Sequence, residues 1–269
     1  MPVAVGAAVA VDAEGWPSVN WTNLVLALLV SLLLQVGVNF ANDYSDGVQG
    51  TDDVRVGPLR LVASGVATPA QVRAAALFAL GAAAAAGFGL AVVTSWWLLV
   101  VGVAALLAAW GYTGGPRPYG YLGLGEVFVF TFFGLVATVG TTYVVSGSLA
   151  WRAYIAGAAV GALACALLVV NNLRDIPTDR EVGKRTLAVR IGDRATRRLY
   201  VALVVVAFIG AVLLVQVTPL LALVAIVPAY GPVGTVLSGA TGRDLIGVLG
   251  QTGRVQLIFG GLLTLGLVL

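Results

Sequence analysis

Two short segments of this 269-residue chain concentrate carboxylates directly after long apolar runs. The first reads NDYSDGVQGTDD from Asn42 to Asp53 and holds four of the chain's twelve acidic residues. If the preceding helix continues to Asp46, polar residues three or four apart project from neighbouring faces of one helix end. These residues are Asn39, Asn42, Asp43 and Asp46. Carboxylate and amide oxygens grouped in this way predict a site for a hard divalent cation such as Mg²⁺.

A single aspartate here is equally consistent with a solvated loop, and the cluster is what favours a metal. Gly47 and Gly50 would let the backbone fold the later acids, Asp52 and Asp53, back toward the helix end. Acids that repel one another at a membrane boundary need a cation to compensate them. We therefore expect metal ligands in this segment.

The second acidic segment, VVNNLRDIPTDREVGKRTLAVRIG, follows another apolar run and repeats the pattern of the first. Asn171, Asn172 and Asp175 have the spacing of Asn42, Asp43 and Asp46, and Asp179 stands at the position of Gly50. Matching polar helix ends on one side of a membrane suggest an internal duplication whose copies face one cavity. Because residues before proline disfavour the helical conformation, we expect Pro177 to break or bend the helix between Asp175 and Asp179.

Fixed positive charges accompany the acids and predict that the ligand is itself an anion. They are Arg55, Arg60, Arg117, Arg174, Lys184 and Arg185. A metal ion that bridges aspartates to phosphate oxygens, with Lys and Arg on the remaining oxygens, is a general way to bind a diphosphate. The positive-inside rule is the alternative explanation; for Arg60 and Lys184 we favour ligand binding. Glu126 is open to two interpretations, an interfacial ion pair near Arg117 or a group that orients a ligand.

Apolar composition predicts an all-α, polytopic membrane bundle. Hydrophobic residues make up 59% of the chain and charged residues 10%, and the mean hydropathy is +0.99. A short apolar helix before Asp12 and eight full spans are expected, within one integral domain over 1–269. The eight runs are 22–41, 71–93, 96–113, 124–145, 153–172, 197–217, 219–236 and 250–269. Small residues four apart, such as Gly157 and Gly161, would let helix backbones approach closely in lipid.

The positive charges in the loops predict which face of the protein lies in the cytoplasm. With eight spans, the loops 42–70, 114–123, 173–196 and 237–249 share one face and, with adjoining helix ends, hold every Lys and Arg except Arg152. That face should be cytoplasmic, and with it the acidic segments. A soluble basic surface for nucleic acid is lacking. The chain has no histidine and one cysteine, Cys165, so imidazole ligands and an intrachain disulfide are excluded.

In order and spacing, three motifs resemble the membrane aromatic prenyltransferases of the UbiA superfamily. They are NDYSD, NNLRDIPTD with the following GKRTLAVRIG, and YTGGPRPYGYLGLGE. The details are most similar to the branch that prenylates 1,4-dihydroxy-2-naphthoate in menaquinone biosynthesis; enzymes for 4-hydroxybenzoate or homogentisate are the nearest alternatives. The resemblance covers nearly the whole chain. It implies a helical bundle, usually of nine spans, in the plasma membrane of a prokaryotic cell.

The resemblance also implies a reaction and its residues. Mg²⁺ would bind at Asn42, Asp43, Asp46, Asp175 and Asp179 and assist ionisation of a polyprenyl diphosphate to an allylic cation, which the aromatic acceptor then attacks. Substrate contacts are expected from Asn39, Asn42, Arg60, Tyr112, Arg117, Tyr119, Asn171, Asn172 and Lys184. Family members often carry an aspartate at the position of Gly50, so Asp52 or Asp53 is expected to substitute. Membrane lipid should surround the prenyl tail, and no obligate protein partner is evident.

Two other functions share some of these features. A cation-coupled transporter would also carry intramembrane acids and repeats, but its acids should lie near the middle of the spans. A phosphatidyl-type transferase would carry one acidic run in a fixed register with a glycine and an arginine, whereas this chain has two separate acidic segments. The position and number of the acidic segments therefore favour a prenyltransferase.

Overall fold

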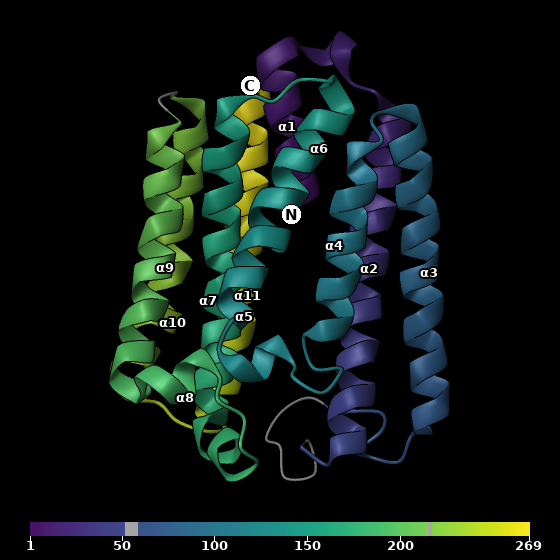
Figure 1. The fold of residues 1–269 in the computed structure, drawn as a ribbon. Coiled ribbons are helices and arrows are strands. Elements are labelled where there is room, and N and C mark those ends of the chain that lie inside the picture. The colour runs from purple at the N-terminus through teal and green to yellow at the C-terminus, as the bar shows by residue number, and fades with distance from the viewer. Residues whose placement is uncertain (52–58, 215–216) are drawn as a thin grey trace. The chain divides into compact units, whose positions relative to one another are not determined.

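A computed structural model describes residues 1–51, 59–214 and 217–269. Asp52, Asp53 and Arg55, which the sequence suggested as ligands, lie outside the described residues. Every regular element in the described part is helical, as the composition predicted (Figure 1). The α-helices are α1 (Pro2–Glu14), α2 (Trp21–Gln49), α3 (Pro69–Val93), α4 (Trp97–Gly111), α5 (Gly125–Val129), α6 (Ala137–Ser146), α7 (Trp151–Glu181), α8 (Leu187–Ile191), α9 (Asp193–Leu213), α10 (Ile226–Leu237) and α11 (Asp244–Val268). Shorter helical turns are η1 (Trp16–Ser18), η2 (Tyr119–Leu122), η3 (Phe130–Val136) and η4 (Thr218–Ala225).

Six helical segments of the described chain are long and apolar enough to cross a membrane, so the expected eight full spans are not confirmed. The six are Trp21–Gln49, Pro69–Val93, Gly125–Ser146, Trp151–Glu181, Asp193–Leu213 and Thr218–Leu237. Two expected spans fall short for different reasons. Helix α4 is apolar but has only 15 residues, fewer than a bilayer needs. Helix α11 has 25 residues, but Gln251, Arg254 and Gln256 lower its hydropathy.

The chain forms two compact units. One comprises Met1–Leu24, Glu126–Arg174 and Ile191–Leu269, and the other comprises Val25–Gly125 and Asp175–Arg190. In the first, α1 packs against both α6 and α11, and α11 also contacts α10. In the second, α3 packs against α4. The second unit therefore joins the end of α2 to the end of α7, which are the two acidic segments.

Helix α2 continues through Asp43 and Asp46 to Gln49, as the spacing of the polar residues predicted. It ends at Gly50, whose φ of 70° places it in the left-handed region. The Gly50 N–H donates to the Gly47 carbonyl (3.4 Å) and the Thr51 N–H donates to the Asp46 carbonyl (3.1 Å). This is the Schellman arrangement that glycine permits at a helix end. The need to end the helix here therefore accounts for a glycine at position 50.

Helix α7 runs from Trp151 to Glu181 without stopping at Pro177, so of the expected break or bend between the two acids, a break is wrong and a bend stays a prediction. Proline inside a helix removes one N–H donor, its ring crowds the carbonyl of the preceding turn, and the helical conformation of the residue before it is disfavoured. The helix nevertheless extends four residues beyond Pro177. Asp175 and Asp179 consequently remain one turn apart on one helix.

Small residues let helix backbones approach one another in the first unit, as Gly157 and Gly161 predicted. A Cβ added to Gly161 would lie 2.9 Å from Gly134 Cα, and one added to Gly134 would lie 2.7 Å from the Gly157 carbonyl oxygen. Nearby, the Thr142 hydroxyl donates to the Gly6 carbonyl of α1 (2.8 Å). Because these neighbours are backbone atoms, a side chain cannot be accommodated by a simple change of rotamer.

Replacing Gly134 tests this close packing. Gly134→Val should lower the free energy of unfolding by about 1–3 kcal/mol, because overpacking forces backbone shifts. The measurement is thermal unfolding of the detergent-solubilised protein. Gly140→Val is the matched control, since a Cβ at Gly140 meets no atom within 4 Å among the described residues. Equal stability of the two variants would contradict the packing described.

Candidate active site

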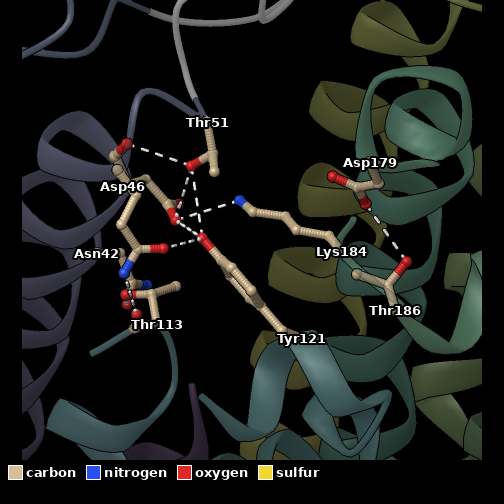
Figure 2. Close-up of polar contacts among 9 residues, drawn as sticks. Asn42, Asp46, Thr51, Thr113, Tyr121, Asp179, Lys184 and Thr186 are labelled. Carbon is tan, nitrogen blue, oxygen red and sulfur yellow. Dashed lines mark hydrogen bonds and ion pairs between the residues drawn. The ribbon is translucent and has the colours of Figure 1, made fainter. Parts of the chain in front are cut away.

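Asp46 is the centre of a polar cluster in the second unit (Figure 2). Its side chain is only 7% exposed. Three groups donate to the same oxygen, Oδ1: the Tyr121 hydroxyl at 2.6 Å, the Lys184 ammonium at 3.1 Å and the Thr51 hydroxyl at 3.2 Å. Asp46 Oδ2 has no protein partner within the described residues, so it remains available to a ligand.

Lys184 and Tyr121 together connect the two acidic segments. The Lys184 ammonium lies 4.6 Å from the centroid of the Tyr121 ring, a cation–π contact. Its side chain reaches from the segment that carries Asp179 to Asp46 (Figure 2). The backbone is fixed as well, because the Arg185 N–H donates to the Tyr121 carbonyl (3.1 Å). The loop between α4 and α5 thus holds the Lys184 segment against the end of α2.

Asp43 has a different role from that of Asp46. Both of its oxygens accept backbone N–H groups, from Leu61 at 2.9 Å and from Val62 at 3.1 Å. Asp43 as a residue is 6% exposed. A carboxylate that accepts two N–H groups anchors the backbone that supplies them. Asp43 therefore fastens the chain beyond Arg60 to helix α2.

The amides of the first segment lie in different environments. The Thr113 hydroxyl donates to Asn42 Oδ1 (2.9 Å), so Asn42 is joined to the loop after α4. Asn39 is exposed, and its amide donates to the Gln35 carbonyl of its own helix (2.7 Å). Within the described residues Asn39 makes no hydrogen bond with the aspartates. The structure brings Asn42 to the cluster but not Asn39.

In the second segment, Asp179 lies near Lys184, the cation that pairs with Asp46. It interacts electrostatically with Lys184, Asp175 and Asp46. The Thr186 hydroxyl donates to Asp179 Oδ2 (3.3 Å) and also accepts the Val189 N–H (3.4 Å) at the start of α8. Asp175 and Asp179 are each 9% exposed. Four buried carboxylates of the two segments thus belong to one compact unit.

The residues of the second segment that precede Asp175 belong to the first unit. Arg174 donates to Asn171 Oδ1 (2.9 Å), and Asn172 donates to Glu126 Oε1 (3.0 Å). Glu126 is 9% exposed, and its Oε2 has no partner among the described residues. The sequence left Glu126 open between an ion pair and a group that orients a ligand; the structure gives Asn172 as the partner of its Oε1.

Aromatic and cationic candidates divide into buried and exposed groups. Tyr112 and Tyr119 meet edge to face with ring centroids 5.4 Å apart, and the Tyr119 hydroxyl donates to the Ala108 carbonyl (2.8 Å). Burial raises the pKa of Tyr119, so its phenol stays protonated at neutral pH. Arg117 is exposed and Arg60 is half-buried. Among the cations expected to bind substrate, Lys184 forms an ion pair with Asp46.

The donors present suit a magnesium ion in type. Four buried carboxylates supply the hard oxygen ligands that Mg²⁺ prefers, and Oδ2 of Asp46 is open. In residues 1–51, 59–214 and 217–269, however, no three Asp, Glu, Cys or His side chains converge closely enough to hold a metal ion. The cation that the structure does place on Asp46 is the Lys184 ammonium, at 3.1 Å from Oδ1.

Sequence patterns gave little sign of the hydroxyl groups that complete the cluster. Tyr121 lies within the motif YTGGPRPYGYLGLGE but was given no role of its own, and Thr51, Thr113 and Thr186 were not expected at all. A threonine or tyrosine hydroxyl carries no charge and has no distinctive spacing. Only the folded arrangement shows that these hydroxyls donate to Asp46, Asn42 and Asp179.

Comparison with known proteins gives consistent matches. Residues 1–244 match the model of the UbiA prenyltransferase family. The chain is 49% identical to the 1,4-dihydroxy-2-naphthoate octaprenyltransferase of Mycobacterium tuberculosis over 241 residues, 89% of this chain and 82% of the relative. It is 39% identical to the Escherichia coli protein of the same name over 212 residues, 76% of this chain and 69% of the relative.

Solved structures share the fold. An apo UbiA homolog from Aeropyrum pernix matches with a TM-score of 0.75 and 14% identity, over 98% of this chain and 95% of that one. A UbiA homolog from Archaeoglobus fulgidus, bound to DMAPP and Mg²⁺, matches with a TM-score of 0.62 and 16% identity, over 99% and 94%. At these identities the likeness establishes the fold.

Removing the Asp43 carboxylate tests its structural role. In Asp43→Ala, the Leu61 and Val62 N–H groups lose their acceptor, so the Arg60–Leu61 bond should open and be cut by trypsin about tenfold faster or more. Limited proteolysis of the solubilised protein measures this rate. Asn39→Ala is the control on the same helix and should leave it unchanged. An unchanged rate in Asp43→Ala would contradict the anchoring role.

Proposed function

This chain belongs to the UbiA prenyltransferase family, as its motifs predicted, and we propose that it transfers a polyprenyl group to 1,4-dihydroxy-2-naphthoate in menaquinone biosynthesis. The donor is a polyprenyl diphosphate. Support for the acceptor comes from relatives at 49% and 39% identity, both named as 1,4-dihydroxy-2-naphthoate octaprenyltransferases. Family membership makes the chain a prenyltransferase rather than a cation-coupled transporter.

The convergence of Asp46, Lys184 and Tyr121 is the observation that carries the proposed mechanism. A diphosphate needs positive charge, and a bound metal needs carboxylates. This unit offers both, because the Lys184 ammonium and the Tyr121 hydroxyl lie within hydrogen-bond distance of the Asp46 carboxylate. We assign the metal ligands to Asn42, Asp43, Asp46, Asp175 and Asp179. Lys184 would bind a diphosphate oxygen, because its flexible stem carries a compact charge with three donors.

When bound, Mg²⁺ supplies charge stabilisation to the diphosphate leaving group. Residues of the chain stabilise the leaving group and the allylic cation. Lys184 neutralises part of the charge that develops on the leaving oxygen. The faces of half-buried tyrosines, including Tyr112 and Tyr119, have the electron density to stabilise an allylic cation. The raised pKa of Tyr119 makes its phenol a hydrogen-bond donor rather than the proton acceptor.

The proposed setting of this site is the cytoplasmic side of a prokaryotic plasma membrane. The chain is an integral membrane protein with six apolar helical segments in its described part. Orientation is inferred from the Lys and Arg residues in the loops that flank the acidic segments. The prenyl tail would extend from the site among apolar helix faces in contact with lipid. Asn171, Asn172, Arg60 and Arg117 remain proposed substrate contacts.

Removing a carboxylate from either segment should abolish turnover. Asp46→Ala and Asp175→Ala each delete a proposed metal ligand and should lower the rate by about a hundredfold or more. The assay measures transfer from radiolabelled polyprenyl diphosphate in detergent. Asp244→Ala removes an exposed acid at the start of α11 and should retain wild-type activity. Wild-type rates in either site variant would contradict metal ligation there.

A second assay tests the metal and the acceptor together. Turnover should disappear after chelation with EDTA and return on addition of Mg²⁺, because the leaving group then regains its counter-charge. Dihydroxynaphthoate, 4-hydroxybenzoate and homogentisate are offered in parallel, and product is expected with dihydroxynaphthoate. Preference for either other acceptor would reassign the substrate, and full activity in EDTA would overturn the mechanism.

A further inference from the structure

Resting on the proposed function, we infer that Lys184 is the resident counter-cation of Asp46 and is exchanged for the metal when the donor's diphosphate binds. Metal and diphosphate then enter the site together rather than one after the other. The ligand of this exchange is a magnesium-bound diphosphate. Lys184 thus balances the charge of Asp46 before the substrate arrives.

The contacts of Asp46 are the first observation. Its side chain is 7% exposed, and Oδ1 accepts from the Lys184 ammonium at 3.1 Å. A buried carboxylate near a membrane requires a compensating cation. Lys184 is the only lysine in the chain, and its side chain is 12% exposed in this ion pair. The negative charge of Asp46 is therefore balanced by the ammonium of Lys184.

The carboxylates of the described residues are spaced too far apart to hold a metal ion by themselves. Across the described residues no three acidic, cysteine or histidine side chains are placed to hold a metal ion, although Asp179 feels Asp175, Asp46 and Lys184 electrostatically. An ammonium and a divalent cation close together repel each other strongly where water is scarce. A metal ion alone must displace Lys184 without offering it a new partner, so it should bind weakly.

A diphosphate changes this balance because it gives Lys184 an alternative partner. The Tyr121 ring lies 4.6 Å from the ammonium, and the Tyr121 hydroxyl donates to the same Asp46 oxygen at 2.6 Å. As the ammonium moves to a phosphate oxygen, the hydroxyl keeps Asp46 in place, and the ring face keeps the ammonium nearby (Figure 2). Oδ2 of Asp46 is then free to bind the metal.

The exchange predicts effects of opposite sign on two ligands. In Lys184→Met, Mg²⁺ alone should bind at least about tenfold more tightly, because its competitor is gone. Inorganic diphosphate in the presence of Mg²⁺ should bind at least about tenfold more weakly, because a phosphate contact is lost. Isothermal titration calorimetry of the full-length solubilised protein measures both affinities. Lys184→Gln serves as a second neutral variant if Lys184→Met does not fold.

Matched variants separate this exchange from a general charge effect. Lys184→Arg keeps a cation and should bind Mg²⁺ alone as weakly as the wild type. Arg73→Met removes an exposed charge from the same unit, where Arg73 lies over the Tyr44 ring, and should alter neither affinity. Unchanged or weaker binding of Mg²⁺ alone by both neutral variants would overturn the exchange. If the wild type binds no diphosphate with Mg²⁺, the proposed function fails as well.

Discussion

The ion pair between Asp46 and Lys184 is the constraint on which the candidate site depends. A carboxylate that is almost fully buried near a membrane is costly unless a cation and hydrogen-bond donors compensate it. Here one oxygen of Asp46 receives an ammonium and two hydroxyls. Since these donors come from the end of α2, the loop before α5 and the segment after α7, a single carboxylate holds three parts of the chain together.

The same segment divides structural and chemical tasks between neighbouring acids. Both oxygens of Asp43 accept backbone N–H groups, whereas Asp46 leaves one oxygen open within the described part. Gly50 ends the helix between these acids and Thr51, and its left-handed backbone turns Thr51 back toward Asp46. A glycine at this position therefore supports the site by shaping the chain rather than by supplying a ligand.

Helix packing provides the frame for these contacts. In the first unit, Gly134 and Gly161 bring two backbones into direct contact, and the Thr142 hydroxyl joins α6 to the Gly6 carbonyl. Lipid offers helices no hydrophobic reason to associate, so close approach and hydrogen bonds of this kind hold a bundle together. Asn172 and Glu126 add a buried polar contact in the same unit.

The sequence by itself determined the all-helical membrane class, the family, the continuation of α2 through Asp46 and the close packing at Gly161. These follow from local patterns: apolar length, the spacing of acids and the small residues. Tertiary structure decided what local patterns do not encode. It carried α7 through Pro177, left Asn39 exposed and gave Asp43 a structural partner. It also placed Lys184 and Tyr121 on one oxygen of Asp46, because residues 75 and 138 positions away meet that oxygen only when the chain is folded.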